Sequence, residues 1–334
     1  DPSSATHGSG VDDEYVLETS YRIQLSPNFN VMPDIQVLID PAKATELLQA
    51  GEEAGFESAW AVDHVVVPDG YESAYPYSDD GKVFAGVNTN PRPDPLIWLA
   101  YAAAVTTRIK LATGVLILPQ RNPVVTAKQV ATLDVMARGR LILGIGVGWL
   151  GEEFAAIGAP FEQRGKRTDE YIAAMRELWT SDSPTFDGEY VHFRNANCRP
   201  RPVNGTVPII IGGHSKAAAR RAGRMGDGFF PARGAPAPII ELARQTAAEC
   251  GRNPSDLEIT PSMPDTPAYT PHQAKLGVAR LMLPVALLSA MTSVSTPVDV
   301  LGLRDVVDAC AERSLITGGA FDKWIYAASC AYRP

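Results

Sequence analysis

The segment from Arg140 to Glu170 restricts the fold of this chain more than any other. It opens with RLILGIGVG, and this run of Leu, Ile and Val is typical of a strand that is covered on both faces. Glycines stand at positions 144, 146 and 148, and Trp149 follows them directly. Because glycine has no Cβ, a planar ligand can approach the backbone at the end of such a strand. A polar loop, EEFAAIGAPFEQRGKR, then leads to a helix that we expect to begin near Thr168.

Strand and helix patterns alternate along the rest of the chain. Strands are predicted at residues 21–27, 58–68 and 109–118, in the opening run RLILGIGVG, at the two ends of VPIIIGGHSKAAARRAGRMGDGFFPA, and at residues 257–263 and 278–284. A helical pattern follows each of them, and a hairpin with Asp187-Gly188 as a two-residue turn is inserted at residues 184–193. Eight such units favour an α/β fold of the closed (β/α)8 TIM barrel type, with insertions. A Rossmann-type open sheet is the alternative, but no GxGxxG motif opens a helix after the first strand.

Composition excludes several classes of partner and site. The net charge of -8 argues against nucleic acid or an anionic membrane surface as the main partner. The 4 cysteines lie far apart and form no CxxC pair, so the sequence predicts no metal site. The apolar stretch from Leu281 is broken by Pro284 and is too short to span a bilayer. A cytoplasmic protein that acts on a small-molecule substrate is the expectation.

The chain is expected to hold one large domain. Residues 1–20 are acidic and rich in Ser and Gly, start without Met and have no apolar core, so we interpret them as a processed or expression-derived leader without a signal peptide. The barrel is predicted over residues 21–314. The composition of residues 315–334 is mixed, and the sequence does not place them.

Four segments in this order resemble the luciferase-like monooxygenase superfamily of flavin- and deazaflavin-dependent enzymes. They are AGFESAWAVDHVVVP, LATGVLILPQRNPVVTAKQVATLD, GRLILGIGVGWLGEEFAAIGAPFEQRGKRTDE and PIIIGGHSKAAARRAGRMGDGFFP. The third is similar to the branch that uses the deazaflavin coenzyme F420. The resemblance covers about residues 21–313, and it implies a bacterial luciferase-like barrel. It also implies an isoalloxazine-like ring across the C-terminal strand ends and a phosphate on a glycine turn. Relatives often pair, so a homodimer is expected.

Asp63 and His64 are the candidate catalytic residues. They end the second predicted strand, on the barrel face where active sites are built. A histidine there can hydrogen-bond a substrate oxygen and exchange a proton as hydride moves. The alternative is a histidine that is satisfied by a neighbouring loop. Asp63 would orient His64, contact the ring, or serve as a structural carboxylate.

The resemblance places the coenzyme ring on the third and fourth strands. In relatives a non-prolyl cis peptide props the ring, and carried over to Thr113-Gly114-Val115 it would fall between Gly114 and Val115. Gly146, Gly148 and Trp149 would then admit the ring edge, or the two glycines would only ease barrel packing. In the sugar-phosphate and secondary-alcohol dehydrogenases of the F420 branch, a Glu that serves as acid aligns with Trp149. Trp cannot donate a proton in that way, so we expect Trp149 to stack on the coenzyme or the substrate.

Two further motifs are candidates for anion binding. Gly212, Gly213, His214 and Ser215 lie between a strand and a helix, where free backbone N–H groups attract a phosphate; a plain helix cap is the alternative. Arg164, with Lys166 and Arg167, would hold the anionic tail of coenzyme F420 or would be a solvated charged face. Arg121 precedes a proline at a helix start and would reach a phosphate or a neighbouring carboxylate.

These residues predict an oxidoreductase that transfers a hydride between coenzyme F420 and a carbonyl, alcohol, imine or activated alkene. One alternative is an FMN-dependent monooxygenase that uses reduced flavin and oxygen. A second alternative is a barrel that binds flavin and catalyses nothing. The aromatic loop at residues 69–93 is expected to shape the substrate pocket.

Overall fold

The computed structural model describes residues 41–53, 56–78, 81–82, 92–231, 236–261, 281–283 and 324–327. Its α-helices are α1 Pro41–Glu53, α2 Pro95–Val105, α3 Pro123–Met136, α4 Gly151–Ala156, α5 Arg164–Thr180, α6 Lys216–Met225 and α7 Ala237–Glu249. Its strands are β1 Ser58–Ala61, β2 Lys110–Thr113, β3 Leu116–Ile117, β4 Leu141–Gly146, β5 Phe186–Asp187, β6 His192–Phe193, β7 Ile209–Gly212, β8 Gly228–Phe230, β9 Glu258–Ile259, β10 Leu281–Leu283 and β11 Trp324–Ala327. Short 3-10 helices run over Leu118–Gln120 and Pro254–Asp256.

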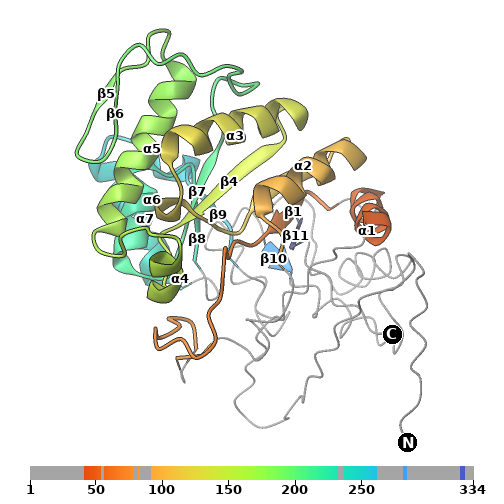
Figure 1. The fold of residues 1–334 in the computed structure, drawn as a ribbon, viewed down its shortest axis with the longest axis horizontal. Helices are drawn as coiled ribbons and strands as arrows, with labels where there is room; N and C mark the ends of the chain where they lie inside the picture. The colour runs from red at the N-terminus through yellow and green to blue at the C-terminus, as the bar shows by residue number, and fades with distance from the viewer. Residues whose placement is uncertain are drawn as a thin grey trace, which may run out of the picture.

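The strands form a curled parallel sheet in the order β10-β11-β1-β2-β4-β7-β8-β9, and β3 pairs with β4. Every pairing in this sheet is parallel. Helices α2, α3 and α5 pack side by side along the outside of the strands, and α6 packs against α7 (Figure 1). Parallel strands that curl and alternate with helices on the outer face match the described part of a (β/α)8 barrel, the fold class that the sequence predicted.

Two apolar layers cover the two faces of the strands, because successive side chains of a strand point to opposite faces. The outer layer packs strand residues such as Leu111, Leu143 and Ile211 against the helices. The inner layer fills the barrel, and its buried members are Trp60, Ala112, Ile142, Ile210 and Phe230. Each strand residue of the outer layer is therefore next in sequence to one that points into the barrel.

Polar caps position the helices. The Asp94 carboxylate accepts hydrogen bonds from Leu96 N and Ile97 N at 2.9 and 3.2 Å, and the Asn122 side chain caps α3 in the same way. Pro123 begins α3, as predicted. At the opposite end of α2, the Arg140 guanidinium donates to the carbonyl oxygens of Ala103 and Thr106. These caps satisfy backbone groups that a helix leaves without partners.

Some local predictions are wrong. The loop predicted between Glu152 and Arg167 contains α4, and α5 begins at Arg164 rather than near Thr168. The predicted strand at 58–68 ends at Ala61. The hairpin is confirmed, but Asp187 pairs with His192, so residues 188–191 form a four-residue connection. That connection is longer because the Glu170 carboxylate accepts the backbone N–H groups of residues 189, 190 and 191.

Other predictions lie outside the described residues. These are the strand at 21–27, the leader, the helix ending near residue 275, the helix at 299–313 and the apolar stretch that follows β10. Within the segment that the sequence did not place, Trp324–Ala327 forms β11 and pairs with β1. In the part of the chain that the structure describes, no helix is long and apolar enough to cross a bilayer.

Candidate active site

The inward-facing glycines of β4 and β7 leave space at the C-terminal ends of the strands, and the side chain of Val115 occupies part of it. A Cβ on Gly146 would lie 2.6 Å from Val115 Cγ2, and one on Gly212 would lie 2.6 Å from Val115 Cγ1. The isopropyl group of Val115 is therefore wedged between the two strand ends. Val115 also packs on the inner layer, where the Trp60 and Phe230 rings lie 5.8 Å apart. Together these groups form an apolar floor at the mouth of the barrel.

The peptide bond between Gly114 and Val115 is cis, as the resemblance implied. It separates β2 from β3, and Gly114 lies so close to Trp60 that a Cβ would come within 2.9 Å of the indole. Thr113 is buried, and its hydroxyl donates to the Gly144 carbonyl at 2.7 Å. The Thr113 side chain thus joins β2 to β4.

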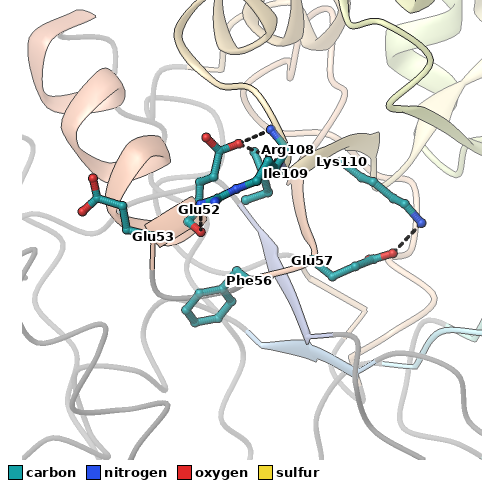
Figure 2. Close-up of a pocket in the computed structure, with 7 residues that line it drawn as sticks. All are labelled: Glu52, Glu53, Phe56, Glu57, Arg108, Ile109 and Lys110. Atoms are coloured by element: carbon teal, nitrogen blue, oxygen red, sulfur yellow. Dashed lines mark hydrogen bonds and ion pairs between the residues drawn. The ribbon is translucent and has the colours of Figure 1, made fainter.

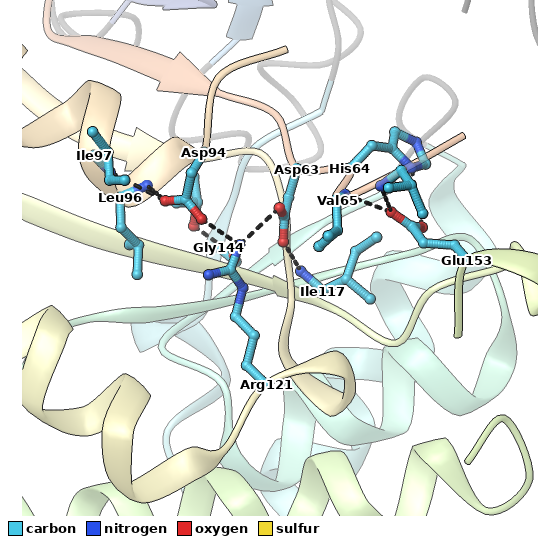
Figure 3. Close-up of polar contacts among 12 residues, drawn as sticks. Asp63, His64, Val65, Asp94, Leu96, Ile97, Ile117, Arg121, Gly144 and Glu153 are labelled. Atoms are coloured by element: carbon cyan, nitrogen blue, oxygen red, sulfur yellow. Dashed lines mark hydrogen bonds and ion pairs between the residues drawn. The ribbon is translucent and has the colours of Figure 1, made fainter. Parts of the chain in front are cut away.

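His64 follows β1, and its imidazole contacts the carboxylate of Glu153, which no local sequence pattern marks as its partner. Its Nδ1 lies 3.2 Å from Glu153 Oε2, and the other oxygen of Glu153 accepts hydrogen bonds from Val65 N at 2.6 Å and Val66 N at 3.3 Å (Figure 3). Glu153 belongs to the first turn of α4 and is fully buried. Burial opposes its ionisation, but the hydrogen bond and charge of His64, the Gln120 side chain and the backbone N–H of Val65 outweigh it and lower the pKa of Glu153.

Asp63 points away from His64. Its carboxylate accepts from Ile117 N at 2.9 Å and from Arg121 Nη2 at 2.9 Å, and the same Arg121 nitrogen reaches Asp94 at 2.9 Å (Figure 3). Burial raises the pKa of Asp63, and the Arg121 charge acts against that rise. These contacts match the role of a structural carboxylate for Asp63. Arg121 contacts two neighbouring carboxylates, which is one of the two alternatives predicted for it. The network joins the end of β1 to β3 and α2.

Aromatic rings from the loop after β1 surround Trp149. The Tyr71 and Tyr75 rings meet Trp149 edge-on, with ring centroids 5.5 and 5.1 Å away, and Tyr77 meets Tyr75 at 5.2 Å. The His64 ring lies 6.2 Å from Trp149 at an interplanar angle of 84°. Trp149 thus forms the centre of an aromatic wall beside His64. Burial raises the pKa of the Tyr77 hydroxyl.

Glu152 holds this aromatic loop against α4. Its carboxylate accepts from Glu72 N at 2.7 Å and Ser73 N at 3.0 Å, and Ser73 Oγ accepts in return from Gly151 N at 3.0 Å. Ser73 therefore acts as the missing side-chain cap of α4, because Leu150 at the N-cap position supplies none. The hydrogen bonds from the Ser73 side chain and these backbone groups lower the pKa of Glu152 to about 2.

The tether between Glu152 and the loop is expected to weaken in acid. Since the folded pKa lies below the ordinary value of 4.5, the tether contributes stability above that value and loses it as pH falls toward about 2. Hydrogen exchange should show the amides of Glu72 and Ser73 losing protection over this interval before the β4 amides do. The Glu152→Gln protein should lack this pH dependence, and the same acid response in both proteins would contradict the tether.

Two of the three basic residues predicted as an anion-binding cluster after β4 bind carbonyl groups of the protein itself. Arg164 Nε donates to the Gly148 carbonyl at 3.0 Å, and its guanidinium lies 3.8 Å from the centre of the Phe161 ring. Arg167 is buried and donates to the carbonyl oxygens of Glu162 and Pro160. Lys166 is exposed at the start of α5. The predicted cluster is therefore not one charged surface, although Arg164 does lie at the strand end that carries Gly148.

The turn between β7 and α6 has free N–H groups at the rim. Gly213 has φ +132°, and Ser215 caps α6 by accepting from Ala218 N at 3.1 Å. Among the described residues, the backbone N–H groups of Lys216 and Ala217 have no acceptor. His214 lies in the same turn. This geometry fits a phosphate, because N–H groups of a helix start and its dipole attract an anion.

A separate pocket of about 390 Å³ lies at the opposite, N-terminal ends of β1 and β2 (Figure 2). The Glu52 carboxylate there accepts the N–H groups of Thr107, Arg108 and Ile109, and Lys110 pairs with Glu57 at 2.7 Å. Glu52, Glu57 and Lys110 thus bind each other or the backbone, which fits a stabilising role at this end of a barrel. Within the described residues no group of three potential ligand side chains could hold a metal ion.

Comparison with known proteins places this barrel in a family. Residues 22–299 match the family described as luciferase-like monooxygenase. The chain belongs to that family. An uncharacterised protein of Mycobacterium tuberculosis is 35% identical over 174 residues, which are 52% of this chain and only 60% of that protein. The F420-dependent glucose-6-phosphate dehydrogenase of Kineococcus radiotolerans is 30% identical over 83% of this chain and 80% of its own length.

Among solved structures, the monooxygenase RslO1 of Streptomyces bottropensis has the same fold, with a TM-score of 0.59 and 22% identity. The alignment covers 88% of each chain. The chain is therefore similar in sequence to a relative named for coenzyme F420, and similar in fold to a structure named as a monooxygenase.

Proposed function

We propose that this protein is an oxidoreductase that binds coenzyme F420 across the C-terminal strand ends and transfers a hydride to or from a small organic substrate. The observations that carry the proposal lie at the C-terminal ends of the strands, where the Val115 side chain fills the space between Gly146 and Gly212 and where Trp149, shortly after β4, meets the His64 ring. A flat apolar floor with one polar side chain at its edge suits a tricyclic ring and a substrate oxygen.

The described residues fit the parts of such a coenzyme. The N–H groups at the start of α6 would hold its phosphate, and Gly148 and Trp149 would border the ring. The bound coenzyme supplies the hydride donor or acceptor. His64 would hydrogen-bond the substrate oxygen or nitrogen and hold or take its proton, and Trp149 with Tyr71 and Tyr75 would exclude water from the reacting atoms. The substrate would be a carbonyl, alcohol, imine or activated alkene.

An FMN-dependent monooxygenase is the second candidate, because the matching family and RslO1 are both named as monooxygenases. A spectroscopic titration of the protein with coenzyme F420 and with FMN separates the two, since the deazaflavin absorbs at shorter wavelength. We expect the deazaflavin to bind at micromolar concentration or tighter, with FMN weaker. Binding of neither coenzyme at micromolar concentration would overturn both candidates, and binding without turnover of any substrate would favour a flavin-binding barrel.

A glycine pair tests the phosphate site. Gly213 and Gly205 both have positive φ, so replacing either with Ala costs backbone energy, but only Gly213 lies at the proposed phosphate site. Gly213→Ala would also bring its Cβ within 2.9 Å of Ala218 and displace the turn. We expect Gly213→Ala to raise the Kd of the coenzyme about tenfold through loss of N–H contacts. Gly205→Ala should leave the Kd unchanged, and equal Kd values for both variants would contradict the site.

The proposal keeps two sequence-based predictions, a homodimer and a cytoplasmic location. Sedimentation of the purified protein measures the first, and fractionation of the source cells measures the second.

A further inference from the structure

The His64 ring is held from two sides. Nδ1 faces Glu153 Oε2 at 3.2 Å, and the Trp149 ring meets the imidazole edge-on. Among the described residues Nε2 has no hydrogen-bond partner, and the side chain is 16% exposed. The imidazole therefore has one nitrogen bound to the protein and one left for a ligand at the barrel mouth.

Glu153 divides its two oxygens between the backbone and this ring. Oε1 accepts from two backbone N–H groups, those of Val65 and Val66, and Oε2 faces Nδ1 (Figure 3). The side chain is fully buried on the first turn of α4, where the helix dipole favours a negative charge. An ionised carboxylate only accepts hydrogen bonds, so the nitrogen that faces it must carry the proton.

We infer that Glu153 is a positioning residue that fixes neutral His64 in the Nδ1–H tautomer and leaves the Nε2 lone pair for the substrate. The inference rests on the proposed function for what Nε2 binds, but the tautomer is a property of the protein alone. In this tautomer neutral His64 accepts a hydrogen bond and takes a proton, and after protonation it donates from Nε2.

Glu153→Gln is expected to reverse the tautomer. The Val65 and Val66 N–H groups need an acceptor, so the single oxygen of the Gln amide must stay on them. The amide nitrogen then faces Nδ1, where it can only donate. Nδ1 becomes an acceptor, and the proton moves to Nε2. The substrate would meet a donor where the wild-type protein presents a lone pair.

Long-range ¹H–¹⁵N correlation spectra of the full chain, without coenzyme and at alkaline pH, report which ring nitrogen carries the proton. The His64 signals are assigned by their loss in His64→Ala. We expect the Nδ1–H pattern in the wild-type protein and the Nε2–H pattern in Glu153→Gln. An Nε2–H pattern in the wild-type protein would overturn the inference. This outcome does not depend on whether either variant folds.

Glu152→Gln is the matched control. It makes the same change one residue earlier on the same helix turn. Among the described residues the Glu152 carboxylate accepts from Glu72 N and Ser73 N and has no hydrogen bond to His64. His64 should keep the Nδ1–H tautomer in this variant. The same tautomer in Glu153→Gln as in the wild type would overturn the inference.

Turnover provides the second readout. Glu153→Gln should lower kcat by about 10²-fold while KM changes by less than about threefold, because the proton acceptor is lost and not the binding surface. Failure of the proposed function can be distinguished from failure of this inference. In the first case the wild-type protein would not bind the coenzyme, but His64 would still show the Nδ1–H tautomer. A reversed tautomer with unchanged kcat would refute the role of His64 as proton acceptor.

Discussion

Turnover is expected to fall by about 10²- to 10⁴-fold when His64 is replaced by Ala, while the coenzyme still binds. The reason is geometric: Glu153 holds Nδ1 of His64, while among the described residues Nε2 has no hydrogen-bond partner and is the nitrogen proposed to meet the substrate. Ala removes the proton acceptor without touching the glycine rim or the start of α6. Steady-state kinetics and the coenzyme titration together measure both effects.

His192→Ala is the control for that experiment. His192 lies in β6 of the hairpin, is exposed and pairs with Asp187 at 2.8 Å, so it has no contact with the barrel mouth. Its loss should leave kcat and coenzyme affinity unchanged. A His64→Ala protein that retains wild-type kcat would remove His64 from the mechanism. A protein that folds but no longer binds the coenzyme would make His64 a binding residue.

Replacing Gly144 with Ala is expected to lower the free energy of unfolding by about 3 kcal/mol or more, at the upper end of overpacking effects. A Cβ at this position would lie 1.9 Å from the Thr113 carbonyl oxygen and 3.1 Å from its carbon. Backbone atoms of a central strand cannot move aside as a flexible side chain can. The hydrogen bond from Thr113 Oγ1 to the Gly144 carbonyl further holds the two strands together at this point. Urea denaturation, followed by circular dichroism, measures the change.

Gly51→Ala is the matched control for packing. Gly51 belongs to helix α1, and the nearest atom to an added Cβ, Ile109 Cδ1, is 4.0 Å away. Alanine should stabilise the helix by about 0.5–1 kcal/mol, because it loses less backbone entropy on folding. A free energy of unfolding for Gly144→Ala within about 1 kcal/mol of the wild-type value would contradict this prediction. It would mean that β2 and β4 can move apart to accommodate the added Cβ.

Much of the fold and the rim could be predicted because the signals are local. The apolar run at Leu141–Gly146 lies within one strand, and Pro123 marks the start of α3 next to its cap Asn122. The resemblance located the cis peptide at Gly114–Val115, since its motif is contiguous. Asp63 and His64 were placed at the correct strand end for the same reason, although β1 is shorter than predicted.

Contacts between distant segments could not be predicted in this way. His64 meets Glu153 across a separation of 89 residues, and no local pattern distinguishes Glu153 from Glu152 as its partner. The basic residues near Arg164 look alike in sequence. In the structure Arg167 is buried and donates to carbonyl oxygens, whereas Lys166 is exposed. The sequence signal that pointed toward Glu153 was the acidic pair Glu152-Glu153, because acidic residues favour the first turn of a helix.

The amino-acid sequence by itself determined the alternation of strands and helices, the glycine-rich rim and the position of His64, because hydrophobic period and glycine placement act within a few residues. Only the tertiary structure decided that Nδ1 of His64 faces Glu153, and that Asp63 contacts Arg121 and Ile117 instead of His64. The physical reason is that a buried polar group must find a partner, and closure of the barrel decides which distant group is within reach.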